Sequence, residues 1–487
     1  MSVDEVFEKN NIKPREGQVE AAEALLKALN SGSDVVFVAP TGWGKTLAVL
    51  AALKASERLP ALWLVRSLEV SRRVLEDAAL LGLKGFAAAG RRRTCPKARE
   101  LGEAVHAWCR LNKPRCPYYL NLLRKGADAY ALTWEELING DVCPYYAQDI
   151  PASTSDVVVQ SYYRRLYPAS ACIVDEAHNV AVPRERRLSV DSVEAAAAEL
   201  ELLGFSELGR EVSVAARRSG YVRFERLPLV ELEAALVEAV DALKKVSGLS
   251  KLVWAVRACS KGGAAYREPW EDYITVYEPP WRPRVRPVVY VSATLPGELE
   301  SLLGVKASVR VRGVSRVAYV TNWLTTKFGE ETWRGYSRLL LELKKRYRKI
   351  LAFTTERVMR VLASSADLVE DRLDEVPEEW AGLLMLKTRG RFAEGIDLRA
   401  DCVIMLGCPF LPPEVTARLR KAYESLGAPS GAALWAPMVM STLQCVGRAT
   451  RGPKDNPIII LADYRFEKYE GFFAPYLTFR SLNIESL

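Results

Sequence analysis

The sequence contains little histidine and glutamine and no long apolar run. Its 487 residues include two His and four Gln. No stretch of about 18 consecutive apolar residues occurs, so no membrane-spanning helix is expected. The N-terminus, MSVDEVFEKNN, is acidic and polar, unlike a secretory signal. We therefore expect a cytoplasmic protein. Because His and Gln are scarce, one that lies inside a motif is more credible as a functional residue.

The composition is that of a folded protein of several domains. Hydrophobic residues make up 49% and charged residues 26%, which excludes a disordered chain, a coiled coil and a collagen. At roughly 100–200 residues per domain, the length predicts three or four domains. The net charge of +8 and pI of about 8.9 are compatible with a polyanionic partner without identifying one. Few amides and many Arg, Glu, Ala and Val residues are typical of a thermophile.

The nine cysteines are unevenly distributed. An odd number in a cytoplasmic chain argues against a disulfide framework. Five scattered ones are expected as small buried hydrophobes, namely Cys172, Cys259, Cys402, Cys408 and Cys445. The other four, Cys95, Cys109, Cys116 and Cys143, lie close together in the chain, and the last two open CPYY strings. Four thiolates suit zinc or an iron–sulfur cluster, although their gaps exceed those usual for zinc. Unliganded core thiols are the alternative.

Nine short apolar runs flanked by helical periodicity predict parallel strands of an α/β protein. They occupy residues 34–40, 61–65, 156–160, 171–176, 288–294, 349–355, 383–387, 401–407 and 457–463. We assign the first five to one sheet and the last four to another, with function at the carboxyl ends of the strands. Residues from about 185 to 275, rich in Ala, Glu, Leu and Arg, are expected to be helical.

The string APTGWGKT (39–46) follows a predicted strand and precedes an apolar helix, which is the context of a phosphate-binding P-loop. Gly42 and Gly44 would let the backbone, with Thr41, fold around phosphates at the helix N-terminus. Lys45 would reach the β- and γ-phosphates, and Thr46 would bind magnesium. A chance glycine turn is the alternative.

Two further strings end predicted strands. In IVDEAHN (173–179), Asp175 can hold magnesium and Glu176 can orient and deprotonate an attacking water. We expect three residues to couple this acidic pair to the rest of the protein. They are His178, one of two histidines, and Ser292 and Thr294 of VSATL (291–295). A surface acidic turn is the alternative.

The string QCVGRATR (444–451) lies in the second predicted sheet region. Gln444, Arg448 and Arg451 have the spacing of one helical face. Two arginines brought against a bound triphosphate would stabilise charge in the transition state. A solvated basic helix face is the alternative.

In order, these strings resemble the motifs of superfamily-two helicases, and specifically of the XPD family of iron–sulfur DNA helicases. The resemblance covers nearly the whole chain. It includes the four-cysteine insertion between the P-loop and DEAH strings, and the strings KPREGQ (13–18), LVRSLEV (64–70), GRFAEGIDL (390–398) and GCPFLPP (407–413). Two residues depart from the family pattern: Trp43 replaces a small P-loop residue, and Val70 replaces a glutamine of the first DNA-contact motif.

The resemblance implies two RecA-like motor domains that bind ATP and Mg²⁺ between them, with two insertions in the first. The first motor domain would comprise residues 1–90, 148–185 and 276–308, and the second residues 309–487. An iron–sulfur insertion would occupy 91–147, where Cys95, Cys109, Cys116 and Cys143 would ligate a [4Fe–4S] cluster. A reduced, helical Arch-like insertion would occupy 186–275. Gln18 is expected at the adenine, Asp397 at the nucleotide and Gly395 in coupling.

The implied activity is ATP-driven translocation on single-stranded DNA with 5′-to-3′ unwinding in DNA repair. The implied partners are DNA junctions and repair proteins, and a monomer is expected. Candidate DNA contacts are Arg66, Arg91, Arg92, Tyr162, Arg389 and Arg391. Tyrosines 118, 119, 145 and 146 would either stack on bases or pack around the cluster, and the run KKRYRK (344–349) is expected to be a solvated helix end.

Two other functions stay open. The short Arch-like insertion and Trp43 favour a translocase that strips proteins from single-stranded DNA without efficient unwinding. The third possibility is a redox-sensing iron–sulfur DNA-binding module with residual ATPase activity. The presence of Glu176, Arg448 and Arg451 counts against it.

Overall fold

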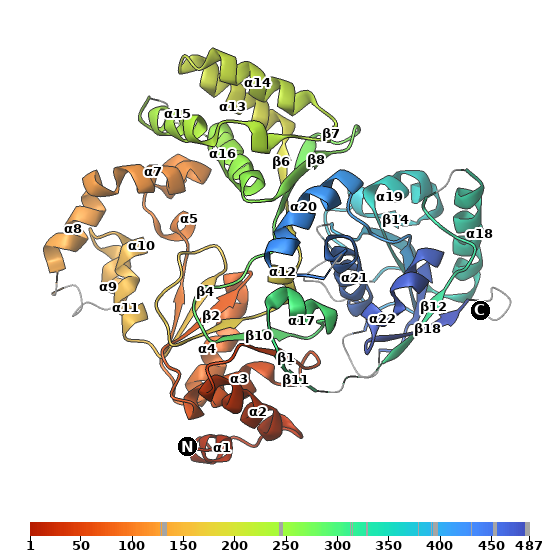
Figure 1. Ribbon diagram of the computed structural model, residues 1–487, viewed down its shortest axis with the longest axis horizontal. Coiled ribbons are helices and arrows are strands. Elements are labelled where there is room, and N and C mark those ends of the chain that lie inside the picture. The colour runs from red at the N-terminus through yellow and green to blue at the C-terminus, as the bar shows by residue number, and fades with distance from the viewer. Residues whose placement is uncertain are drawn as a thin grey trace.

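The computed structural model contains two parallel sheets that lie side by side, with two insertions on the first (Figure 1). It describes residues 1–487 except 127, 129–133, 243–246, 312, 314, 328–329, 378, 391, 393–397, 430, 451–454 and 483–487. Four of the predicted site residues, Arg391, Gly395, Asp397 and Arg451, lie outside the described residues.

The first sheet has seven parallel strands and contains the first five predicted ones, as expected. Their order is β11 (Ala307–Arg310), β1 (Val35–Val38), β10 (Val288–Ser292), β5 (Ala171–Val174), β2 (Ala61–Val65), β4 (Val157–Ser161) and β3 (Gly85–Ala88). The central strands are buried along their whole length, which explains their unbroken apolar runs. The helices of this unit are α1 (Val3–Lys9), α2 (Gln18–Asn30), α3 (Lys45–Ala55), α4 (Ser71–Leu80), α12 (His178–Ala181) and α17 (Glu298–Leu303).

The second sheet, also of seven parallel strands, contains the last four predicted ones. Its order is β14 (Leu368–Val369), β15 (Gly382–Lys387), β13 (Lys349–Thr354), β16 (Cys402–Leu406), β17 (Ile458–Ala462), β12 (Arg316–Val320) and β18 (Leu477–Ser481). Its helices are α18 (Glu330–Arg346), α19 (Glu356–Leu362), α20 (Pro413–Ser425), α21 (Ala432–Gly447) and α22 (Glu470–Phe473). The basic run at 344–349 ends α18, as predicted, and begins β13.

The segment from about 185 to 275, which was expected to be helical, is helical in part. It contains α13 (Val190–Leu202), α14 (Ser206–Arg217), α15 (Leu229–Ala242) and α16 (Ser247–Ser260). It also contributes to an antiparallel sheet in the order β6 (Arg184–Ser189), β9 (Tyr273–Glu278), β8 (Ala264–Arg267) and β7 (Gly220–Tyr221). The charged strand β6 forms because its backbone pairs with β9, from Arg184 opposite Glu278 to Ser189 opposite Tyr273. We call this unit, residues 184–278, the four-strand insertion.

The cysteine-bearing segment between β3 and β4 is built from short helices at the edge of the first sheet (Figure 1). They are α5 (Arg91–Thr94), α6 (Ala98–Leu101), α7 (Val105–Asn112), α8 (Pro117–Lys125), α9 (Trp134–Asn139), α10 (Pro144–Ala147) and α11 (Asp149–Ser153). In the described part of the chain, no helix is long and apolar enough to cross a bilayer.

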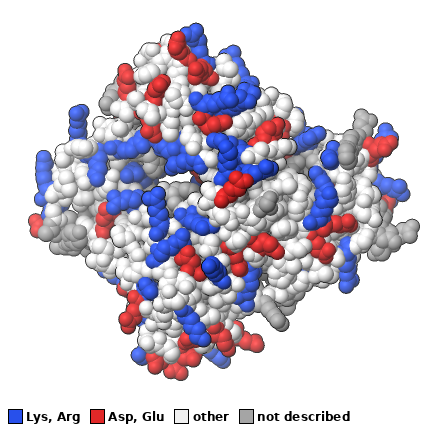
Figure 2. Space-filling view, in the orientation of Figure 1, with Lys and Arg blue, Asp and Glu red and all other residues white. Residues whose placement is uncertain are grey.

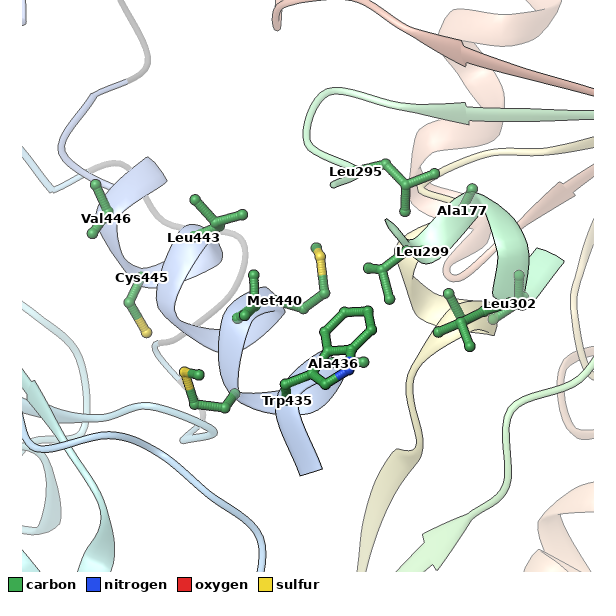
Figure 3. Close-up of a cluster of buried hydrophobic side chains, with 14 of the residues drawn as sticks. Ala177, Leu295, Leu299, Leu302, Trp435, Ala436, Met440, Leu443, Cys445 and Val446 are labelled. Carbon is green, nitrogen blue, oxygen red and sulfur yellow. The ribbon is translucent and has the colours of Figure 1, made fainter. Parts of the chain in front are cut away.

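One hydrophobic core crosses the boundary between the two parallel-sheet units. Figure 3 shows Trp435, Ala436 and Met440 of α21 facing Leu295 and Leu299 of the first unit. Trp435 is 5% exposed, and Leu295 and Leu299 are fully buried. The units therefore share an apolar boundary, along which the polar contacts described below are protected from water.

Candidate nucleotide-binding site

The P-loop connects β1 to α3 and has the backbone that phosphate binding requires. Gly42 and Gly44 have φ angles of 79° and 100°, a region that only glycine adopts without strain. Lys45 is the first residue of α3, and its Nζ donates to the carbonyl oxygens of Ala39 (2.9 Å) and Pro40 (3.1 Å). Burial lowers the pKa of Lys45, and the charges of Glu176 and Asp175 oppose that shift. The lysine therefore lies within electrostatic reach of the acidic pair.

The side chain of Gln18 supports the P-loop through hydrogen bonds. This side chain is nearly fully buried, Nε2 donates to the carbonyl of Gly44 (3.0 Å), and Oε1 accepts from the amide of Arg15 (2.8 Å). A Cβ on Gly44 would lie 2.7 Å from Nε2, so the close approach also requires glycine there. Whether Gln18 contacts adenine stays a prediction.

The unusual Trp43 packs inward. Its ring meets Phe37 of β1 edge-to-face, with 5.8 Å between centroids and an interplanar angle of 70°, and it packs against the core of the first unit. A bulky residue is therefore accommodated by the apolar layer next to the loop rather than pointing outward into solvent.

The acidic pair follows β5, and β10 lies between β5 and β1. The P-loop and the acidic pair were expected at the ends of adjacent strands. Instead, β10 separates the strand that carries the P-loop from the strand that carries the acidic pair. Burial, and then the neighbouring Glu176, raise the pKa of Asp175 to about 6. Glu176 has a φ of 50°, a costly conformation for a residue with a side chain. Its amide donates to Asp175 Oδ1 (3.0 Å), while its own carboxylate is half exposed at the sheet edge.

Three of the four predicted coupling residues, His178, Ser292 and Thr294, lie beside this pair; the fourth, Gly395, is outside the described residues. His178 Nδ1 is 3.4 Å from Glu176 Oε2 and 3.3 Å from Ser292 Oγ. Burial lowers the pKa of His178 to about 3, and the charges of Arg66 and Arg448 act in the same direction. Ser292 Oγ donates to the carbonyl of Thr294 (2.9 Å) and accepts from its amide (3.2 Å). His178 is therefore a neutral link between Glu176 and the loop after β10.

The second unit contributes Gln444 and Arg448. Gln444 lies in α21, which ends at Gly447, and Arg448 follows as its cap with helical φ and ψ angles of −66° and −36°. The predicted spacing therefore continues through Arg448, one residue beyond the helix itself. Because the charge of Arg448 lowers the pKa of His178, its guanidinium lies within electrostatic reach of His178, the neighbour of Glu176.

The four clustered cysteines approach one another. Cys109, Cys116 and Cys143 are less than 10% exposed, and Cys116 and Cys143 directly precede α8 and α10. Burial raises the pKa of Cys143 to about 11, while the backbone N–H groups of Tyr146 and Tyr145 act in the opposite direction. The thiols of Cys109 and Cys116 also raise the pKa values of both Cys95 and Cys143.

This gathering is not a closed coordination shell. Within the described ranges, no group of three or more His, Cys, Asp or Glu side chains is arranged to hold a metal ion. By residue type the four thiols suit an iron–sulfur cluster, and the backbone N–H groups of Tyr146 and Tyr145 favour the thiolate of Cys143. The tyrosines of this segment pack with cations: Arg91 stacks on Tyr145 with 4.1 Å between guanidinium carbon and ring centroid.

Three of the predicted DNA contacts have partners within the protein. Tyr162 is 6% exposed, and its hydroxyl donates to the backbone carbonyl of Asp175. Arg91 also donates to the hydroxyl of Tyr146 (3.2 Å), and Arg389 forms an ion pair with Glu185 (3.0 Å). Their side chains thus have structural roles that the sequence did not indicate.

Exposed candidates remain beside these residues. Arg66 and Arg92 are exposed. Tyr163 is 49% exposed, and the guanidinium carbon of Arg184 lies 3.6 Å from its ring centroid. Sequence analysis missed Arg184, because it belongs to the four-strand insertion and meets Tyr163 only in the fold.

A groove of about 1480 Å³ lies between the four-strand insertion and the carboxyl ends of β13, β15 and β16. Its lining includes the rings of Tyr266, Trp270, Tyr273 and Phe410 and the cations Arg187, Lys327, Arg357, Lys387 and Arg420. Glu268 and Glu271 also line it, and burial raises the pKa values of both carboxyl groups. Rings with interleaved cations are typical of a single-strand groove.

Comparison with known proteins finds a family match for one part of the chain and similar folds for nearly all of it. Residues 338–476 match the model of the helicase C-terminal domain family. No protein of curated function matches the sequence. The structure places the P-loop and the acidic pair on the first parallel-sheet unit and Arg448 on the second.

The fold of the chain is XPD-like. The chain is similar to an XPD helicase with a TM-score of 0.70 and 19% identity, over 97% of this chain and 100% of that one. It is also similar to an XPD in its apo form (TM-score 0.63, 17% identity, 95% and 100% covered). A third match is Xpd4 of S. tokodaii (TM-score 0.60, 17% identity, 96% and 100% covered). The resemblance to the XPD family is thus confirmed for the fold.

Proposed function

We propose that the chain is an ATP-driven DNA helicase that translocates on single-stranded DNA and unwinds duplexes from 5′ to 3′. The observation that carries this proposal is the electrostatic coupling of Lys45, Asp175 and Glu176 at one edge of the first sheet, with Arg448 of the second unit close by. DNA repair, acting at junctions together with repair proteins, is the proposed setting.

In this mechanism the P-loop amides and Lys45 bind the β- and γ-phosphates, and Glu176 orients the attacking water and takes its proton. Arg448 stabilises the charge on the γ-phosphoryl group in the transition state. Magnesium, held by Asp175 and Thr46, would neutralise phosphate charge. Loss of the γ-phosphate removes a contact shared by the two units. The boundary between the units then opens, and the contacts with the bound DNA strand change position.

The strand is proposed to follow the groove of aromatic and basic residues described above. Cations bind phosphates and release counterions, while rings stack on bases without sequence preference. In Figure 2, Lys and Arg side chains gather between the lobe of α13–α16 and the lobe of the first sheet. This band supports a polyanion crossing the first unit before it reaches the groove.

Cys95, Cys109, Cys116 and Cys143 are proposed to ligate a [4Fe–4S] cluster. Such a cluster would join four short helices, α5, α7, α8 and α10; in the described part of the segment, one small apolar cluster has Val142 and Ala147 as its buried members. The group would act structurally there and would fix α5, the helix that carries Arg91 and Arg92. Bound zinc would show that the cofactor is misassigned.

Strand displacement tests the function. Anaerobically purified protein, ATP and magnesium are mixed with duplexes that carry a 5′ or a 3′ overhang. Displacement from the 5′ overhang alone supports the proposal. DNA-stimulated ATP hydrolysis without displacement would indicate the translocase, and no hydrolysis would indicate a binding module. Glu176→Gln should bind ATP but turn it over at least a hundredfold more slowly; unchanged turnover would contradict the assigned role of Glu176.

A further inference from the structure

The side chain of Tyr476 crosses the boundary between the two units. Tyr476 lies between α22 and β18 of the second sheet, and its hydroxyl reaches Leu295 in the loop after β10 of the first. The hydroxyl accepts a hydrogen bond from the amide of Leu295 (2.8 Å) and donates one to its carbonyl (3.0 Å). One side chain of the second unit thus holds both backbone groups of one residue in the first.

The contacts continue from Leu295 to the acidic pair. The amide of the preceding Thr294 donates to Ser292 Oγ (3.2 Å). Ser292 Oγ lies 3.3 Å from His178 Nδ1, which lies 3.4 Å from Glu176 Oε2. An unbroken series of polar contacts therefore links the proposed catalytic carboxylate to the second unit, at its boundary with the first.

Both ends of the link are fixed to their own units. The carbonyl of Tyr476 accepts from the amide of Arg316 (3.0 Å), and the next residues pair along β12. On the other side, Arg310 donates to the carbonyl of Leu295 (2.9 Å) and forms an ion pair with Glu300. Burial raises the pKa of Tyr476, so the hydroxyl keeps its proton and its donor role. Each end of the link is therefore held by contacts within its own unit.

We propose that Tyr476 is a positioning residue that transmits movement of the second unit, through the Leu295 loop and His178, to Glu176. This inference rests on the proposed function and adds a residue that none of the helicase strings contains. Because the hydroxyl binds backbone groups of Leu295, it adds to the hold that the buried Leu295 side chain already gives this loop. DNA held by the second unit would thereby influence the orientation of Glu176.

Tyr476→Phe removes both hydrogen bonds and keeps the ring. Steady-state ATP hydrolysis of the full chain is measured with and without single-stranded DNA. We expect the DNA-stimulated kcat to fall about tenfold, while the KM for ATP and the basal rate stay within twofold of the wild type. Tyr347→Phe, which removes a hydroxyl at the end of α18, is the matched control and should change none of these values.

A double variant separates positioning from simple structural support. Ser292→Ala interrupts the same series of contacts, so Tyr476→Phe with Ser292→Ala should lower the stimulated rate no further than the worse single variant. Multiplicative losses, an equal fall in basal and stimulated rates, or an unchanged Tyr476→Phe would overturn the inference. Wild-type protein without DNA-stimulated hydrolysis would overturn the proposed function and this inference together, whereas normal wild-type stimulation with an unaffected Tyr476→Phe would overturn this inference alone.

Discussion

Arg389 and Glu185 lie 3.0 Å apart and join the second sheet to the four-strand insertion. Arg389 follows β15 and also donates to Ser441 Oγ (3.1 Å) and to the carbonyl of Pro409 (2.7 Å). Burial raises the pKa of Glu185, and the charges of Arg389 and Arg187 oppose that shift. The prediction that Arg389 binds DNA stays a prediction, and its ion pair gives it a second role in joining the insertion to the second unit.

The first prediction concerns this ion pair. Arg389→Ala would leave Glu185 largely buried without its main partner, and we expect it to lower the free energy of unfolding by about 1–3 kcal/mol. Urea denaturation measures the loss. Arg72→Ala is the control, because the Arg72 side chain is 87% exposed in its pair with Glu76, and a change within about 0.5 kcal/mol is expected. Full stability of Arg389→Ala together with weaker DNA binding would restore the DNA-contact hypothesis.

The second prediction concerns the close packing of α13 and α16. A Cβ at Gly248 would lie 2.6 Å from the amide nitrogen of Ala196 and 2.8 Å from the carbonyl oxygen of Ser192. Since backbone atoms cannot yield as a side chain can, Gly248→Ala should destabilise the protein by about 1–3 kcal/mol. Thermal unfolding measures this effect. Gly471→Ala, whose Cβ would meet nothing within 4 Å, should not destabilise the protein. If Gly248→Ala lowered the stability no more than Gly471→Ala does, α13 and α16 could separate freely to admit the methyl group.

Much of the fold and part of the site could be predicted from the sequence, because their signals are local. The strands of both parallel sheets are short apolar runs, and the P-loop combines a strand, two glycines and a helix start within a few residues. His178 and Ser292 were recognised because each belongs to a string that ends a strand. Their mutual contact follows from the parallel pairing of β10 with β5.

The remaining features depend on partners far away in the chain. Strand β6 reads RERRLS and has no strand-like alternation of its own; it forms because β9, some 90 residues later, supplies the pairing. Tyr162 resembled a DNA contact because two adjacent tyrosines followed a strand, yet burial against Asp175 separates its role from that of Tyr163. Tyr476 lies in no helicase string, so only the fold could reveal it.

The third prediction concerns the clustered thiols. Cys116→Ser should abolish the visible absorption of anaerobically purified protein and lower its iron content, because one of four proposed ligands is replaced by a poor donor. Cys259→Ser, at a fully buried position outside the segment, should leave both unchanged. Wild-type protein that contains zinc, or neither metal, would contradict the cluster assignment.

The last prediction concerns the contact between Gly44 and Gln18. Gly44→Ala would place a Cβ 2.7 Å from Gln18 Nε2 at a φ of 100°. The backbone of the loop would therefore be strained, and the loop would have to move away from Gln18. Gly32→Ala is a matched control, because Gly32 also has a positive φ, 67°, but an open surrounding. Gly32→Ala should cost about 1 kcal/mol of stability, the price of left-handed backbone alone, and bind ATP normally. Gly44→Ala should weaken equilibrium binding of a fluorescent ATP analogue at least tenfold, because the amides that follow Gly42 no longer face one phosphate group. Equal ATP affinity of the two variants would show that the support from Gln18 does not shape the phosphate site.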